Sequence, residues 1–259
     1  MDIAISSILA PIISILAYKS AYPDWTTATC EHYARNAYLY TLAMLVIYWM
    51  LLALFNQTKL GSTFMLQLYS SWLYIILYIL LLIIIMTIVQ FTDPRNVFMK
   101  HFTLLIFIII FALATVPAYV LYQPVLIIAL AIAILIGFIT YQLIMTYPSM
   151  MTQERANNIS IAFIIAFIAY IVFVVFIIPS IIIKYPAIIY FGILLFSIGF
   201  AVIFSLRMMV HHHEIVEHSK VCNMSNHLPD YVNEALGVFI TFVNLIIEIA
   251  RILFLTRRR

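Results

Sequence analysis

Charged residues are scarce in this sequence. Only 9% of the 259 residues are Asp, Glu, Lys or Arg, whereas 66% are hydrophobic and the mean hydropathy is +1.14. A soluble globular domain carries about a quarter charged residues, because its surface must be hydrated. So little charge cannot cover a folded surface in water. The composition therefore excludes a soluble globular protein and indicates a surface that faces lipid.

Several other features are also missing. With 5 glycines and 9 prolines, the chain has no collagen-like repeat and no flexible linker. The net charge is only +3, and no basic surface alternates with aromatic residues, so we expect no nucleic-acid partner. No nucleophile is paired with a base, and no glycine-rich loop is present to hold a phosphate. We therefore expect no enzymatic activity and no cofactor.

The sequence has only two cysteines, Cys30 and Cys222. Two thiols in a chain of this length do not make a disulfide framework. We predict two free thiols, and a single bridge between them is the alternative.

Long apolar runs dominate what is present. A helix needs about 20 mostly apolar residues to cross a hydrocarbon core, and strands would leave backbone groups unpaired in lipid. The runs predict an all-α integral membrane protein, a bundle of seven transmembrane helices over 37–55, 72–91, 103–121, 125–146, 159–179, 186–207 and 231–255. The short connection at 122–124 predicts that the third and fourth spans form an antiparallel hairpin. Residues 37–255 would form the membrane domain, between an N-terminal segment (1–36) and a basic tail (256–259).

The N-terminal segment itself contains an apolar run from Ile3 to Tyr18. Asp2 stands where a signal peptide would carry basic residues. We interpret the run as an interfacial or short buried helix, so that segment 1–36 is cytosolic or interfacial. An eighth span and an uncleaved signal are the alternatives.

The basic residues of the loops predict orientation, because cytoplasmic loops are enriched in Lys and Arg. With a cytosolic N-terminus, only Lys59 and Lys184 lie outside, and seven basic residues lie inside: Lys19, Arg35, Arg95, Lys100, Arg155, Arg207 and Lys220. The basic tail from Arg257 to Arg259 does not fit this orientation, because seven crossings would place it outside. Six crossings plus a re-entrant segment is the alternative.

Four different short motifs follow one another along the chain from about residue 33. They are Arg35-Asn36-Ala37-Tyr38, then Pro94 and Asn96 with Phe102-Thr103-Leu104-Leu105, then Ile139-Thr140-Tyr141-Gln142, and finally Phe239 to Leu245 with Asn244 inside it. Their order and spacing resemble the Bax inhibitor family of transmembrane proteins, including the diverged members carried by large DNA viruses. The resemblance implies a protein of the endoplasmic reticulum or Golgi membrane, with the plasma membrane as alternative. It also implies that the protein modulates cell death, calcium homeostasis or immune signalling through other membrane proteins, with calcium ions as a further partner.

The sequence departs from this family at two deep positions. Members that conduct calcium carry a pair of aspartates in the last two spans, and such a pair shares a proton and titrates together. The matching positions here are Ser205 and Thr241. Hydroxyl groups can hydrogen-bond between helices, but they cannot hold that proton or neutralise a divalent cation. We therefore expect a protein that acts on partners. The alternative is an ion channel or leak pore, resembling a viroporin.

One acid, Glu248, lies deep in the last span, where ionisable residues are functional candidates. Arg251, three residues later, is on the same helical face and in reach of an ion pair. We favour the interpretation that both side chains extend to the membrane interface. Asp230 and Glu234 open the same helix, and we predict that they cap it.

The stretch from His211 to Asp230 is polar, and we predict a solvated loop. It contains weak candidates for metal ligands, namely His211, His213, His218 and Cys222. A zinc-binding His-Glu-x-x-His helix requires a second histidine four residues after His213, and that position is Glu217. We therefore predict no metal site.

Overall fold

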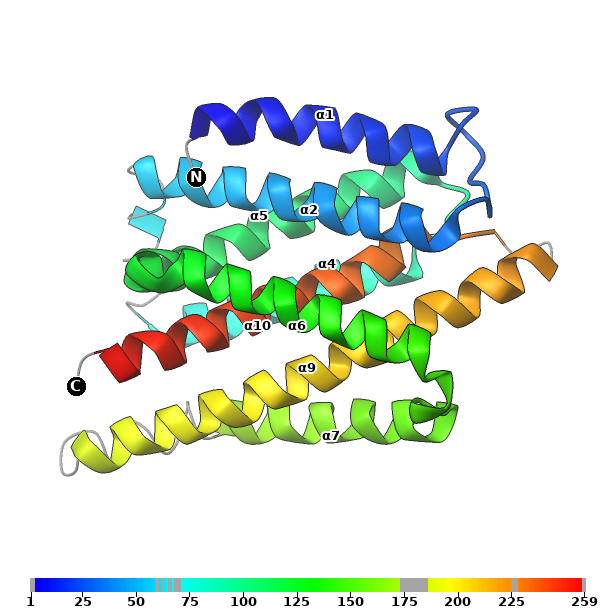
Figure 1. Ribbon diagram of the computed structural model, residues 1–259. Helices are drawn as coiled ribbons and strands as arrows, with labels where there is room; N and C mark the ends of the chain where they lie inside the picture. The colour runs from blue at the N-terminus through cyan, green and yellow to red at the C-terminus, as the bar shows by residue number, and fades with distance from the viewer. Residues whose placement is uncertain are drawn as a thin grey trace. The chain divides into compact units, whose positions relative to one another are not determined.

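The structure is a computed structural model, and it describes residues 3–58, 61, 63–64, 67, 71–172, 186–224 and 228–257. These residues form eight long helices and contain no strand (Figure 1): α1, Ile3–Ala21; α2, Tyr33–Gln57; α4, Trp72–Phe91; α5, Val97–Tyr122; α6, Leu126–Thr146; α7, Gln153–Val172; α9, Pro186–Met224; and α10, Tyr231–Arg257. Two 3-10 turns, η1 (Gln123–Val125) and η2 (Pro148–Met150), flank α6. The predicted all-helical class is confirmed. The predicted span 159–179 continues past Val172 into residues outside the described part.

The helices begin and end where the sequence supplies local partners for backbone groups. Ser71 precedes α4, and its Oγ accepts a hydrogen bond from the Leu73 N–H at 3.3 Å. Asp93 lies between α4 and α5 and accepts from the Arg95 N–H at 2.8 Å. Proline occupies the first turn of both 3-10 elements, where its missing N–H would have no partner. The chain therefore turns between predicted spans at Asp93, at Gln123–Val125 and at Pro148–Met150.

Five stretches of the described residues are long and apolar enough to cross a membrane: Tyr33–Gln57, Leu73–Phe91, Val97–Thr146, Tyr190–Cys222 and Tyr231–Arg257. The third stretch contains both α5 and α6. The outer surface of α4 is apolar, since Leu73, Ile76 and Ile84 are at least half exposed. Extended apolar surface of this kind is rare on a soluble monomer and is expected where helices face lipid. The chain is thus a helical membrane protein by the length and composition of its helices, and the number of seven spans stays a prediction.

The chain divides into two compact units. Unit 1 comprises residues 1–121 and 215–239, and unit 2 comprises residues 122–214 and 240–259. The division falls within α9 and α10, so each of these helices contributes to both units. The core of unit 1 is built from α2, α5 and the first part of α10. In it the ring of Phe239 packs edge-on against Tyr48 and Phe111, with centroids 5.5 and 5.7 Å away. In unit 2 a smaller core contains Ile144, Met151, Ala156 and Val210.

Helix α1 packs along α2 within unit 1 (Figure 1). Ala10, Ala17 and Ala21 are buried, and the exposed positions include Ile8, Ile12, Ile15 and Leu16. An interfacial helix would present a polar face to water, whereas this exposed face is apolar. The 19 residues of α1 measure about 28 Å at the rise of an α-helix, close to the thickness of a hydrocarbon core. Helix α1 is therefore an apolar helix packed on α2, and its position relative to the membrane stays a prediction.

The polar stretch after His211 is not a loop. Helix α9 continues for 39 residues to Met224, and the side chains of His211 and His212 are buried. The prediction of a solvated loop from His211 to Asp230 is wrong for this part. No glycine or proline lies between Gly199 and Pro229, so nothing in the backbone ends the helix where the side chains become polar. Lys220 also pairs with Glu217 at 2.7 Å, three residues earlier on the same helix.

The two cysteines are joined. Cys30, in the loop after α1, forms a disulfide with Cys222, near the end of α9, and their Cα atoms are 5.7 Å apart. The prediction of two free thiols is therefore wrong. The sequence separation of 192 conceals the pair in the sequence, and only the packing of unit 1 brings the two segments together.

Candidate functional site

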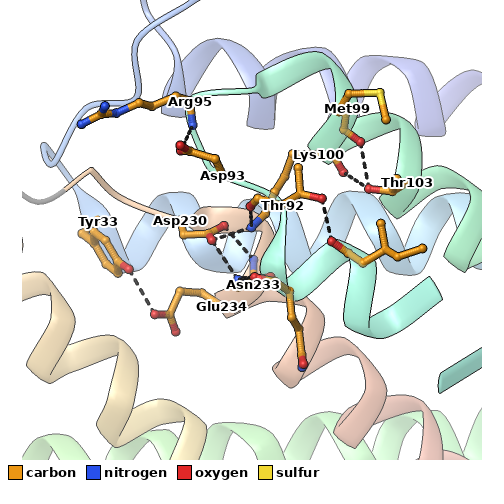
Figure 2. A network of polar contacts seen from close by, with 12 residues as sticks. Tyr33, Thr92, Asp93, Arg95, Met99, Lys100, Thr103, Asp230, Asn233 and Glu234 are labelled. Carbon is orange, nitrogen blue, oxygen red and sulfur yellow. Dashed lines mark hydrogen bonds and ion pairs between the residues drawn. The ribbon is translucent and has the colours of Figure 1, made fainter. Parts of the chain in front are cut away.

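A network of polar side chains lies at the beginning of α10 in unit 1 (Figure 2). At its centre the Lys100 ammonium lies 2.6 Å from Asp230 Oδ2. The Lys100 side chain is 1% exposed, and it also donates a hydrogen bond to the Thr92 carbonyl at 2.9 Å. A lysine is almost never fully buried unless it is paired. The ion pair therefore holds the first turn of α5 to the start of α10.

Asp230 also caps α10, as the sequence predicted. Its Oδ1 accepts a hydrogen bond from the Asn233 N–H at 3.2 Å, which satisfies one of the free donors of the first turn. The Asn233 amide in turn donates to Asp230 Oδ2 at 2.8 Å and to the Gln90 carbonyl at 3.0 Å. The end of α4 is thereby joined to the same network.

Glu234 joins α10 to other elements. Its carboxylate accepts a hydrogen bond from the Tyr33 hydroxyl at 3.1 Å and also contacts the His218 imidazole. Tyr33 opens α2, and His218 belongs to the last part of α9. One carboxylate thus connects three helices of unit 1. Glu234 does lie in the first turn of α10, where its charge suits the helix dipole, but its hydrogen bonds run to α2 and α9.

Asn36 anchors the loop between α1 and α2. It is completely buried, its Oδ1 accepts from the Ser20 hydroxyl at 2.6 Å, and its amide donates to the Glu31 carbonyl at 3.0 Å. The Tyr231 hydroxyl donates to the carbonyl of Thr29, next to the disulfide. Loop 22–32 is therefore fixed to the start of α10 by hydrogen bonds and to the end of α9 by a covalent bond.

The network contains one buried carboxyl, that of Asp230, whose pKa is shifted from its ordinary value. Burial raises the pKa of the Asp230 carboxyl, while the hydrogen bond and charge of Lys100 oppose that rise and the negative charge of Glu234 adds to it. Proton uptake by Asp230 would therefore change the contact between α5 and α10.

Unit 2 contains a second buried ion pair. Arg251 Nη1 lies 3.0 Å from each carboxylate oxygen of Glu248, which is 6% exposed. Arg251 also donates to the Tyr122 hydroxyl at 3.2 Å and lies 3.5 Å from the Ser197 hydroxyl. The two charges are enclosed by protein groups of unit 2. The interpretation in which both side chains extend toward the interface does not describe this arrangement, because Glu248 is turned into the unit.

The two positions that match the family's aspartates both belong to unit 2. The Ser205 hydroxyl donates to the Ala201 carbonyl of its own helix at 2.7 Å, and Thr241 is a buried residue of α10. Other residues of the family-like motifs make local contacts. Arg35 donates to the Ser20 hydroxyl at 3.2 Å, and the Asn244 amide donates to the Ile240 carbonyl at 2.8 Å. Tyr38 is half-buried on α2.

The weak candidates for metal ligands have other contacts. His211 pairs with Glu214 at 3.1 Å, His218 contacts Glu234, and Cys222 is consumed by the disulfide. His213 is half-buried on α9. Within the part of the chain that the structure describes, no three His, Cys, Asp or Glu side chains gather around a common point that would suit a metal.

This network is difficult to recognise in the sequence, because its members are isolated polar residues within apolar runs. From the sequence alone, Lys100 counts as one of the loop charges, and Asn36 belongs to the first of the four motifs. A single lysine in the first turn of an apolar helix was the available signal, since such a residue requires a partner.

We compared the chain with models of protein families, with curated proteins and with solved structures, and none of them matches it. The resemblance to the Bax inhibitor family is therefore carried by the order of the four motifs.

Proposed function

We propose that this chain is a Bax-inhibitor-like membrane protein that acts through other membrane proteins and so modulates cell death, calcium homeostasis or immune signalling. It has no enzymatic activity in this proposal. Support comes from the ordered motifs, which extend from Arg35 in α2 to Asn244 in α10, and from the helical membrane fold.

The observation that carries the proposal is the absence of an acid pair at the two deep positions of α9 and α10. Ser205 donates to its own helix, and Thr241 is a hydroxyl residue. A carboxylate gate requires two acids that share a proton. The deep acid of unit 2, Glu248, is instead neutralised by Arg251 at 3.0 Å. This arrangement favours a partner-binding protein over a leak pore.

The disulfide supports a membrane of the secretory pathway, such as the endoplasmic reticulum or Golgi membrane. Disulfides form and persist in oxidising compartments and are rare in the cytosol. We propose that Cys30 and Cys222 face the lumen, opposite to the orientation that the loop charges predicted. Two of the residues in that count are neutralised in ion pairs, since Lys100 contacts Asp230 and Lys220 contacts Glu217.

Helix α1 completes this topology as an eighth crossing. With loop 22–32 in the lumen, the start of α1 lies in the cytosol. Seven further crossings then return the end of α10 to the cytosol as well. The basic tail from Arg257 to Arg259 would then agree with the enrichment of Lys and Arg on the cytosolic side.

The proposal is tested by calcium flux through purified protein in liposomes, over a range of pH. We compare the unmodified protein with a Ser205→Asp, Thr241→Asp double variant and with a Ser205→Ala, Thr241→Ala control. We expect flux only from the aspartate variant, because only that variant regains an acid pair. A calcium leak from the unmodified protein that depends on pH would overturn the proposal in favour of a pore.

A further inference from the structure

Unit 1 contains a cavity of about 280 Å³ between α1, α2 and α5. Its wall is mostly apolar and includes Ala17, Ala43, Met44, Ile47, Leu104 and Ile108. A dry apolar cavity of about 150 Å³ already binds benzene in another protein, so this volume admits a longer hydrocarbon.

The polar side chains of the cavity already have partners. His101 Nδ1 lies 2.7 Å from the Val97 carbonyl, which only an N–H can satisfy, so the proton is on Nδ1. His101 Nε2 is therefore an acceptor, and the Tyr40 hydroxyl donates to it at 2.9 Å. With both ring nitrogens engaged, the inner wall selects for an apolar group.

The cavity adjoins a second, wider hollow near the start of α5. The two share Tyr18, Trp25, His101 and Leu105, and the second is also lined by the polar residues Thr26, Arg95 and Asn96. Arg95 is exposed, and in Figure 2 its guanidinium extends away from the Lys100–Asp230 pair. An apolar chamber thus continues into a hollow that carries one cation.

Trp25 is held at the junction of the two hollows. Its φ of 63° lies in the left-handed region, which is unusual for a bulky residue and is often maintained at binding sites. The Tyr18 hydroxyl donates to the Trp25 carbonyl at 2.7 Å, and the two rings lie 5.7 Å apart. The disulfide at Cys30 fixes the end of the same loop.

We propose that this site binds a long-chain fatty acid anion. The alkyl chain occupies the cavity between α1, α2 and α5, and the carboxylate binds Arg95. One chain-sized cavity and one guanidinium match a ligand with one tail and a single negative charge, and arginine pairs with carboxylates through two parallel hydrogen bonds. This inference is independent of the function proposed above.

The test uses the full-length protein in nanodiscs of zwitterionic lipid, with palmitate that carries a photoreactive diazirine as the probe. Labelled peptides are identified by mass spectrometry, and unlabelled palmitate serves as competitor. We expect labels on α1, α2 or α5 within the cavity wall. Labels confined to other helices would overturn the proposal.

Two variants probe the two halves of the site. Ala43→Phe fills the cavity and should abolish labelling, and Arg95→Gln should weaken palmitate affinity roughly tenfold through loss of a charged hydrogen bond. The matched controls are Leu42→Phe, on the outer side of α2, and Arg155→Gln, at another exposed arginine. If Ala43→Phe fails to fold, Ile47→Phe obstructs the same cavity. Normal labelling of a folded cavity-filling variant would refute the assignment.

The head group is tested by competition. Hexadecanol, which has the same chain without a charge, should compete much more weakly than palmitate. If hexadecanol competes as well as palmitate, Arg95 has no role in binding the head group. If lysophosphatidate competes more strongly than palmitate, the preferred head group is a phosphate and not a carboxylate. Either result would overturn the assignment of a fatty acid anion.

Discussion

The ammonium of Lys100 and the carboxylate of Asp230, separated by 130 residues in sequence, lie 2.6 Å apart in the interior of unit 1. Their exposures differ greatly, because the lysine side chain is 1% exposed and the aspartate side chain is 24% exposed. Removal of the lysine and removal of the aspartate should therefore have different effects on stability. The first two predictions concern this pair.

Asp230→Asn should destabilise the protein more than Lys100→Met does. The first change leaves a fully buried ammonium without its counter-ion, for which the penalty is about 3–5 kcal/mol. The second removes the buried charge and leaves the partly exposed Asp230. Thermal unfolding in detergent would measure both, with Lys220→Met as control, because the exposed pair of Lys220 with Glu217 contributes under ~1 kcal/mol. Equal losses from all three variants would contradict the prediction.

The Asp230 carboxyl should bind its proton at a higher pH than an ordinary aspartate. Burial raises its pKa, against the opposing effect of Lys100. The folded protein should therefore release this proton at a higher pH than the unfolded chain does. Infrared difference spectra, with Asp230→Asn to assign the band, should show the protonated carboxyl disappearing with a midpoint above ~3.9. A midpoint below that value would contradict the prediction.

In unit 2, Arg251→Met should be more harmful than Glu248→Gln. The methionine variant leaves the buried carboxylate of Glu248 without a cation and with only the Ser197 hydroxyl, whereas the glutamine variant leaves Arg251 with the hydroxyls of Tyr122 and Ser197. We expect a loss of several kcal/mol for the first and a smaller loss for the second. The free energy of unfolding in denaturant measures both. Arg155→Gln is the control. A larger loss for Glu248→Gln than for Arg251→Met would show that the carboxylate is not enclosed.

Cys30 and Cys222 should be oxidised in the protein isolated from cells. A maleimide that adds mass should modify neither thiol before reduction and both thiols after it. Cys222→Ser should destabilise the protein by about 2–4 kcal/mol. Two free thiols in freshly isolated membranes would contradict the bridge and, with it, the proposed lumenal position of these segments.

The proposed topology makes a separate prediction about the two sides of the membrane. Asn223-Met224-Ser225 is a glycosylation sequon at the end of α9. If this end is lumenal, the sequon should carry a glycan that a glycosidase removes and that Asn223→Gln abolishes. A thiol introduced by Thr256→Cys should react from the cytosolic side of sealed vesicles. Reaction only after the vesicles are opened would reverse the assignment.

The sequence by itself determined the helical class and most of the helix positions. Hydropathy and helix length are local properties, and a bilayer requires each apolar segment to satisfy its own backbone hydrogen bonds. For this reason α2, α4 and α5 lie close to the predicted spans, and the breaks at Asp93 and Pro124 could be predicted from neighbouring residues alone.

The tertiary structure alone decided which distant groups meet. The bridge between Cys30 and Cys222, the ion pair of Lys100 with Asp230, and the attachment of α1 to α2 each join segments through packing. A hydropathy profile contains no such information, because many apolar helices pack against one another equally well by composition. The few polar side chains select the partners, since a buried charge or amide without a counterpart is strongly unfavourable.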